Sequence, residues 1–316
     1  MDRNFRLRLA LIACLLVLCF QSGVFHLAAA ALSQKQTLSL LLFLQTGRIL
    51  RSPEAAPPAQ APPAETQPPT IPTNPPKMPA FSADELVEVQ YFCDYRPDLE
   101  SLLTQELDWS LRGDAPTVLI VHSHATEGYI GTDGYRSLDE QQNMVAIGEE
   151  IARVLESYGI HVLHDKTYHD HPDYDASYTN ARSTIRSYLE KYPSIKMVLD
   201  IHRDASDATS GQLTTSATVG GQKSAQLMLV VGTDARGNHH PNWRENLSLA
   251  LKLTALLEQE NPGICRPTAL RSERFNMDLT AGSLLVEVGA AGNTLPEAKI
   301  AADALAQAIA TLADGA

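Results

Sequence analysis

Residues 117–312 alternate between short apolar runs and longer stretches with helical periodicity. This alternation constrains the fold most, because it is typical of α/β proteins in which helices cover both faces of a mostly parallel sheet. The pattern predicts strands at 117–121, 160–163, 195–201, 213–219, 225–232 and 284–286, and helices in the second half of 84–111 and at 144–158, 178–191, 243–260 and 296–312.

The N-terminal part of the chain lacks this alternation. Residues 9–32 contain no Asp, Glu, Lys or Arg, and these 24 residues are long enough to cross a bilayer as a helix. Arginines within residues 1–8 favour a cytoplasmic location for this N-terminal tail. The sequence therefore predicts a single-pass protein of the cell membrane whose remaining residues lie outside the cytoplasm. A cleaved signal peptide ending near residues 28–30 is the competing interpretation, and it also exports the remainder.

Residues 33–80 are predicted to be a juxtamembrane segment followed by a linker. The apolar run at 38–44 is too short to span a membrane. Residues 53–79 hold 11 of the 19 prolines, a composition typical of semi-extended spacers. The sequence therefore predicts one folded domain at 81–316, held at a distance from the membrane.

Charge and cysteine content exclude several functions. The formal net charge is −12, and the chain lacks the basic stripe that nucleic-acid binding requires. No Cys-x-x-Cys pair is present, which argues against a thiolate zinc site. Cys93 and Cys265 could form a disulfide outside the cytoplasm, but the sequence does not determine whether they meet.

Polar side chains suited to zinc follow three of the predicted strands. His124 and Glu127 follow the strand at 117–121, His202 follows the strand at 195–201, and Glu287 follows the strand at 284–286. Because sites in α/β sheets form at the carboxyl ends of the strands, these residues are expected to converge.

The residue types suit a catalytic zinc ion, which needs about three protein ligands and an open position. His124, Glu127 and His202 are the predicted ligands, and Glu287 is the predicted general base that passes a proton from water to the leaving nitrogen. The structural alternative is that the histidines are satisfied core residues and that Glu287 is an ion-pair partner.

Four further residues are candidates for supporting or substrate-binding roles. His122 could replace His124 because the two share strand parity, and Glu140 could replace Glu127 as the third ligand. Asp200 could orient a ligand imidazole, and Arg203 could bind a substrate carboxylate. The histidines and aspartates of residues 164–173 are predicted to form a solvated surface loop.

Four motifs together resemble the stage II sporulation protein P family. They are Val121-His-Ser-His-Ala-Thr-Glu-Gly-Tyr129, Asp200-Ile-His-Arg-Asp204, Arg274-Phe-Asn-Met-Asp278 and Glu287-Val-Gly-Ala-Ala-Gly-Asn293. The resemblance runs from about residue 91 to residue 310, and an N-terminal membrane segment with a variable linker is the usual layout of this family.

The resemblance implies a zinc N-acetylmuramoyl-L-alanine amidase domain of the phosphorylase/hydrolase-like type, acting on peptidoglycan. It also implies endopeptidase action on peptide cross-links, a role in septal wall thinning and engulfment during sporulation, and the stage II sporulation proteins D and M as partners. By the same resemblance, His124 and His202 are zinc ligands and Glu287 is catalytic. Related amidases place the ligand glutamate further along the chain, which favours Glu140, whereas the His-x-x-Glu spacing favours Glu127.

Two other functions remain open from the sequence. A zinc carboxypeptidase-like peptidase has its ligands and catalytic glutamate in the same order, and the products released would distinguish it. A non-catalytic wall-binding module would have no need for Glu287 beside a metal.

Overall fold

The computed structural model describes residues 87–132, 135–205 and 213–314. The predicted cytoplasmic tail, membrane segment and linker, residues 1–80, lie outside this part. Within it, no helix combines the length and apolarity needed to cross a bilayer.

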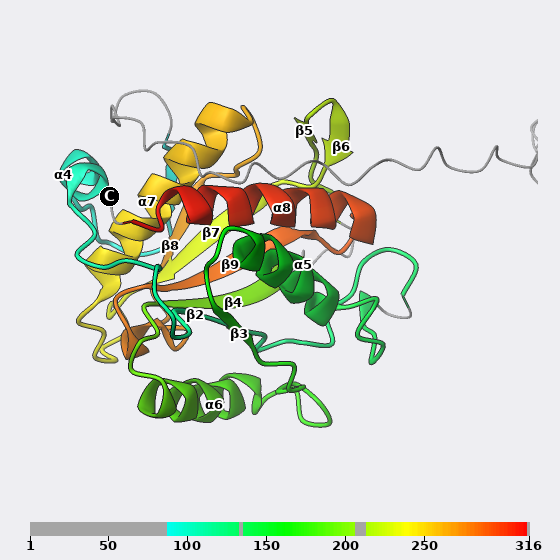
Figure 1. Cartoon of the computed structure of the whole chain (residues 1–316), viewed down its shortest axis with the longest axis horizontal. Helices are drawn as coiled ribbons and strands as arrows, with labels where there is room; N and C mark the ends of the chain where they lie inside the picture. The colour runs from blue at the N-terminus through cyan, green and yellow to red at the C-terminus, as the bar shows by residue number, and fades with distance from the viewer. Residues whose placement is uncertain (1–86, 133–134, 206–212, 315–316) are drawn as a thin grey trace, which may run out of the picture. The chain divides into compact units, whose positions relative to one another are not determined.

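Seven strands form one sheet in the order β1-β8-β7-β9-β4-β2-β3 (Figure 1). Neighbouring strands of this sheet run parallel except for β7 and β9. A mostly parallel sheet is therefore confirmed. The strand bounds are β1 (Val89–Tyr91), β2 (Val118–Val121), β3 (Val162–His164), β4 (Met197–Asp204), β7 (Leu227–Gly232), β8 (Thr268–Arg271) and β9 (Ser283–Ala290).

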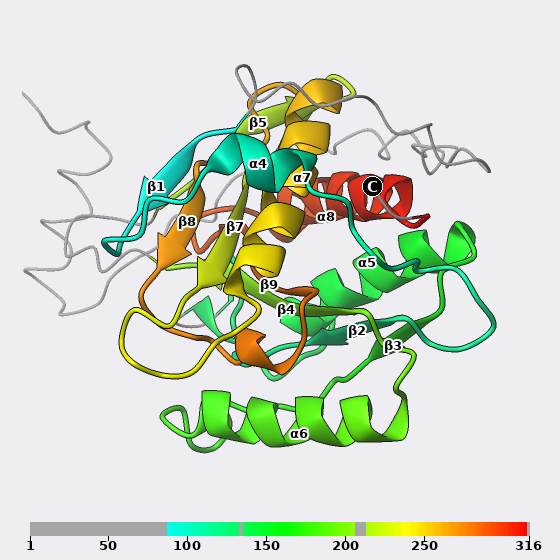
Figure 2. The same cartoon turned by 90° about the vertical axis from the view of Figure 1, so that its left-hand side faces the viewer.

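Helices cover both faces of the sheet, as Figure 2 shows. The helices α5 (Met144–Ser157), α7 (Trp243–Glu260) and α8 (Leu295–Thr311) lie on one face, and α6 (Ser177–Lys191) lies on the other. The short α4 (Leu99–Thr104) packs against α7. A separate hairpin consists of β5 (Ala217–Val219) and β6 (Gln222–Ser224).

Local sequence signals fix the ends of the helices. Helix α8 begins with a capping box in which Thr294 and Glu297 satisfy each other's backbone N–H groups. Asn143 caps α5 by accepting from the backbone N–H of Val145. At the other end of α5, Gly159 has a φ of 74°, a conformation that glycine adopts without strain.

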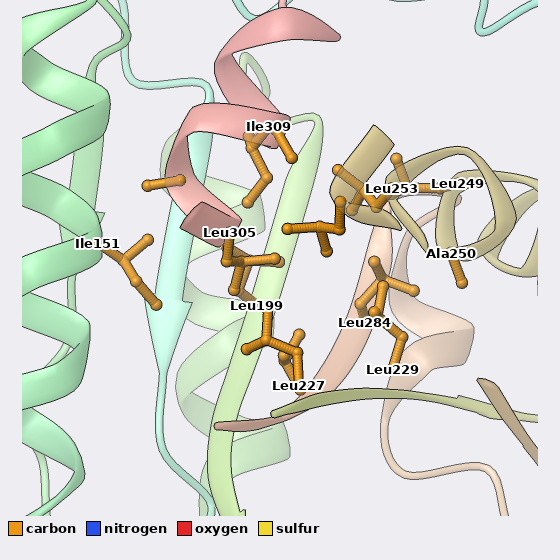
Figure 3. Packing of buried hydrophobic residues seen from close by; sticks show 14 of the residues in the cluster. Ile151, Leu199, Leu227, Leu229, Leu249, Ala250, Leu253, Leu284, Leu305 and Ile309 are labelled. Atoms are coloured by element: carbon orange, nitrogen blue, oxygen red, sulfur yellow. The ribbon is translucent and has the colours of Figure 1, made fainter. Parts of the chain in front are cut away.

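The main core lies between the sheet and helices α5, α7 and α8. Leu199 and Leu284 from the central strands pack there with Ile151, Leu305 and Ile309 from the helices, and all are fully or almost fully buried (Figure 3). Burying each such side chain contributes roughly 1.5–3 kcal/mol, so this layer supplies most of the stability of the fold.

A smaller core lies between the sheet and α6. Val198 of β4 packs there against Ile185, whereas Leu199 and Ile201 of the same strand belong to the main core. Because side chains alternate along a strand, Asp200 and His202 share the α6 face with Val198. This alternation determines the face on which a site can form.

The strands differ from the predicted ones at several points. The predictions ended β4 at residue 201 and β9 at residue 286, but both strands continue, so His202 and Glu287 lie within strands rather than after them. Polar residues extend these strands because β4 and β9 pair with each other beyond His202 and Glu287, and β7 also pairs with β9 there. Strands β1, β6 and β8 were not predicted. The predicted strand 213–219 is reduced to β5, outside the main sheet.

Candidate metal centre

The sheet brings the four predicted site residues together. His202 and Glu287 are register partners on the neighbouring parallel strands β4 and β9, so their side chains emerge side by side on one face. The ring centroids of His124, just past β2, and His202 are 5.3 Å apart. Glu127 Oε2 lies 3.6 Å from His202 Nδ1. Residues that are up to 163 positions apart in the sequence therefore share one buried site (287 − 124 = 163).

Arg203 holds Glu127 in this site. The backbone N–H of Arg203 donates to Glu127 Oε2 at 3.2 Å, and its Nη1 lies 3.6 Å from Oε1. The same guanidinium donates to the carbonyls of Gly128 and Tyr135 at 2.9 and 3.0 Å. Arg203 is buried, so these contacts favour a supporting role in the loop over contact with a substrate.

Asp200 and Ser123 support the imidazole of His202. Asp200 Oδ1 lies 2.9 Å from His202 Nε2, although the angle is not that of a hydrogen bond. Asp200 also accepts from the backbone N–H and the hydroxyl of Ser123 at 2.7 and 2.5 Å. The orienting role expected of Asp200 is consistent with this position.

Two tyrosines from the region of α6 form an aromatic wall. Tyr174 stacks on the His124 ring with centroids 4.5 Å apart, and Tyr178 meets the same ring edge-on at 5.3 Å. Tyr178 is also stacked against His202 at 6.3 Å. Burial raises the pKa of Tyr178, so its hydroxyl keeps its proton and remains a donor.

The electrostatics of the site favour a cation. Burial lowers the pKa of His202, but the neighbouring Asp200 and Glu127 outweigh burial and raise it well above the usual value. Burial, with a further contribution from the charge of Glu127, raises the pKa of Glu287 to about 8. Carboxylates thus crowd one small volume, and a positive charge placed between them would be stabilised.

The donor chemistry fits a divalent metal ion. His124 Nδ1 and Glu287 Oε2 are buried without hydrogen-bond partners. The separation of 3.6 Å between His202 Nδ1 and Glu127 Oε2 is close to the ~3.3 Å expected for two ligands of one tetrahedral zinc ion. However, across residues 87–132, 135–205 and 213–314, no group of three or more His, Cys, Asp or Glu side chains is already placed to hold a metal ion. Binding would therefore require side-chain rotation.

The alternative ligands lie elsewhere. Glu140 is exposed, with its side chain 4.0 Å from Lys166, so the structure places Glu127 rather than Glu140 in the site. His122 does not share the face of His124, because β2 ends at Val121 and the chain turns. Its Nε2 lies 2.8 Å from His164 Nε2, against α5, and its Nδ1 donates to the carbonyl of Ile201 at 3.1 Å.

The loop at residues 164–173 is not wholly solvated, which corrects the prediction. Asp165, His169 and Asp170 are buried. His169 Nδ1 lies 2.9 Å from the carbonyl oxygen of His122, and Asp170 Oδ2 lies 3.9 Å from His124 Nδ1. The loop folds back because these polar groups satisfy the backbone beyond β2. The high density of His and Asp after a strand end was the only feature of the sequence that indicated burial of this loop.

The Arg274-Phe-Asn-Met-Asp278 motif supports the aromatic wall. Asn276 donates to the carbonyl of Tyr178 at 2.8 Å, and the Phe275 ring lies 5.8 Å from the Tyr178 ring. Phe275 and Asn276 have φ values of 49° and 61°, an uncommon backbone conformation for residues other than glycine. Asp278 accepts two hydrogen bonds of 2.7 Å from Arg182 of α6, which ties the motif to the helix.

The segment after Glu287 fixes the end of β9. Gly289 has a φ of 72°, and a side chain there would lie 2.8 Å from Ala225 Cβ. The buried Asn293 accepts from the backbone N–H of Ala290 and donates to the carbonyl of Thr215 and to Glu297. The Glu-x-Gly-x-x-x-Asn motif therefore has a structural explanation beyond Glu287 itself.

The disulfide considered between Cys93 and Cys265 is not formed, and both residues are free thiols.

Comparison with known proteins shows the family to which the chain belongs. A family model described as Stage II sporulation protein P matches residues 63–310. The chain belongs to the stage II sporulation protein P family. The resemblance seen in the four motifs is thereby confirmed. A family relative from Bacillus subtilis (strain 168), named Stage II sporulation protein P, is 30% identical over 210 residues, which cover 61% of this chain and 50% of that protein. The chain thus spans about half the length of that relative.

Two solved structures are also similar to the chain. One is the N-acetylmuramoyl-L-alanine amidase AmiC2 of Nostoc punctiforme, with 13% identity, a TM-score of 0.40, and coverage of 62% of this chain and 97% of that one. The other is an N-acetylmuramoyl-L-alanine amidase from Clostridium difficile 630, with 15% identity, a TM-score of 0.41, and coverage of 63% and 97%.

Proposed function

We propose that this chain is a zinc-dependent N-acetylmuramoyl-L-alanine amidase of cell-wall peptidoglycan. The observation that carries the proposal is the meeting of two imidazoles and two buried carboxyl groups at His124, Glu127, His202 and Glu287. Membership of the stage II sporulation protein P family supports a role in sporulation.

His124, Glu127 and His202 would hold the zinc ion. When bound, the ion would supply Lewis acidity toward the amide carbonyl and toward the attacking water. Arg203 contacts Glu127 and Asp200 contacts His202, which would limit how far these two side chains must rotate when an ion binds. These supports reduce the reorganisation that binding would require.

Glu287 performs the proton transfers. Its buried Oε2 has no hydrogen-bond partner, so it is available to a substrate or a water molecule. Burial raises its pKa, and a cation bound beside it would lower the pKa again, toward the range in which a carboxyl group can both accept a proton and return it. Glu287 would take the proton of the attacking water and pass it to the nitrogen of the leaving alanine.

The layout of the chain suggests where this reaction takes place. The apolar segment at residues 9–32 would anchor the protein in the membrane, and the proline-rich segment would extend the catalytic domain toward the wall. We include in the proposal cleavage of peptide cross-links, wall thinning during engulfment, and the stage II sporulation proteins D and M as membrane partners.

Digestion of purified wall sacculi tests the proposal. The full chain should release stem peptides and leave free lactyl ends on muramic acid, and chelation should stop the release. Glu287→Gln should lower turnover by at least ~10²-fold while zinc and wall binding persist. Glu140→Gln is the matched control and should remain active. Undiminished cleavage by Glu287→Gln would reject the mechanism, and release of terminal amino acids instead would indicate a carboxypeptidase.

A further inference from the structure

A cavity of about 460 Å³ opens beside His124, and the site described above does not use it. Tyr174 forms one wall of the cavity and stacks on the His124 ring at 4.5 Å. Thr126, in the loop between His124 and Glu127, forms another part of the wall. A group bound in the cavity would therefore be separated from His124 by the Tyr174 ring.

The carboxylate that lines the cavity is already satisfied. The Asp170 side chain is fully buried. It accepts from the backbone N–H of Thr126 at 3.3 Å, from the Thr126 hydroxyl at 2.5 Å, and from Arg136 Nη1 at 3.0 Å. Because its charge is paired with Arg136 and its oxygens already accept hydrogen bonds, Asp170 would attract a cationic ligand only weakly and repel an anionic ligand only weakly.

Arg136 retains hydrogen-bonding capacity toward the cavity. Only Nη1 is used in the described structure, where it donates to Asp170 and to the Thr126 hydroxyl at 2.7 Å. The guanidinium carbon lies 4.5 Å from the centroid of the Tyr174 ring, and the side chain is 40% exposed. The ring contact and the paired Nη1 fix the guanidinium plane, while the other nitrogens keep the donors that suit a carboxylate.

The rim of the cavity is apolar. Leu138 is 59% exposed and Tyr174 is 49% exposed, so two large apolar side chains face solvent beside the arginine. An exposed apolar surface next to an unused charged donor matches a ligand with a short aliphatic part and a carboxylate. An amino-acid residue of a peptide has this composition.

We propose that this cavity binds a free carboxylate of the peptide on the leaving side of the scissile amide, with Arg136 as the recognition residue. The inference rests on the proposed amidase function and adds a specificity to it. Because one residue spans at most ~3.6 Å, a carboxylate one or two residues beyond the scissile bond could reach past Tyr174 to Arg136. Peptides in which this carboxylate is amidated would bind more weakly.

Calorimetric titration with a matched ligand pair tests the proposal. The ligands are the γ-methyl ester of N-acetylmuramoyl-L-alanyl-D-glutamate and the same ester with its α-carboxylate amidated, so that only the first carries a free carboxylate. The full chain is used with Glu287→Gln as background to prevent turnover. The free acid should bind about tenfold more tightly than the amide, as expected for a charge-assisted contact.

Leu138 offers variants that change charge without disturbing the Arg136 contacts. Leu138→Glu places a negative charge at the rim and should abolish the preference for the free acid. Leu138→Gln has nearly the same shape without the charge and should keep the preference. Arg136→Lys should reduce the preference as well, because it loses the planar fork.

The outcomes separate this inference from the proposed function. Equal binding of the two ligands, no binding of the free acid, or equal effects of Leu138→Glu and Leu138→Gln would overturn the cavity assignment even if the chain cleaves sacculi. If the free acid is preferred and only Leu138→Glu removes the preference, the assignment stands even if cleavage fails.

Discussion

Replacing Gly148 by alanine should destabilise the protein, although glycine is normally unfavourable within a helix. Gly148 lies in α5, where a Cβ atom would come within 2.5 Å of His164 Nε2 and 2.7 Å of His122 Nε2. Helix propensity alone predicts that alanine stabilises by about 1 kcal/mol. Overpacking costs about 1–3 kcal/mol, and breaking the buried contact between the two imidazoles costs about 1–3 kcal/mol more. The expected net loss is therefore about 1–5 kcal/mol.

Urea unfolding of the full chain measures this loss. Burial lowers the pKa of His122 to about 3 and that of His164 to about 4, so both rings are neutral at pH 7 and the loss is not a charge effect. Ala152→Gly on the same helix is the comparison and should cost about 1 kcal/mol through propensity, plus a small loss of packing because Ala152 is partly buried against the core. If Gly148→Ala raised the free energy of unfolding, the close packing of the two histidines against α5 would be refuted.

Two further substitutions test the electrostatics. Burial and the neighbouring Glu150 raise the pKa of Asp303 to about 7, so the folded state keeps a proton that the unfolded chain releases near pH ~4. Its contribution to stability is complete below pH ~4 and is lost as the pH rises through about 7. Asp303→Asn should therefore gain about 2–3 kcal/mol on the parent between pH 5 and pH 8. A difference independent of pH would contradict the retention of this proton in the folded state. Arg203→Lys should lower the free energy of unfolding in urea by about 2–3 kcal/mol, because Glu127 and the loop carbonyls lose a planar donor. The control, Arg186→Lys on the exposed side of α6, should change the free energy of unfolding by less than ~0.5 kcal/mol. Equal losses in the two arginine variants would count against the supporting role of Arg203.

Long periodic elements could be predicted from the sequence. Helix α7 has the predicted bounds because a continuous apolar face ends at Asn261-Pro-Gly263. Strands β1 and β8 could not be predicted, since each is short and its pairing comes from distant segments. The antiparallel β7–β9 pair likewise depends on tertiary structure, because periodicity does not specify strand direction.

The same limit applies to the candidate site. His124, Glu127, His202 and Glu287 could be selected because residue type and position near a strand end are local properties. Asp170 and the two tyrosines could not, because they reach His124 only when the loop before α6 folds back across the sheet. The His-x-x-Glu spacing favours Glu127 over Glu140, and the structure buries Glu127 and exposes Glu140.

Elemental analysis of the purified full chain shows whether these side chains bind zinc. We expect about one zinc ion per chain, its loss in His124→Ala, Glu127→Gln and His202→Ala, and its retention in Glu140→Gln and Glu287→Gln. A parent chain without zinc, or zinc retained equally in all five variants, would contradict the assignment of these side chains to one metal centre.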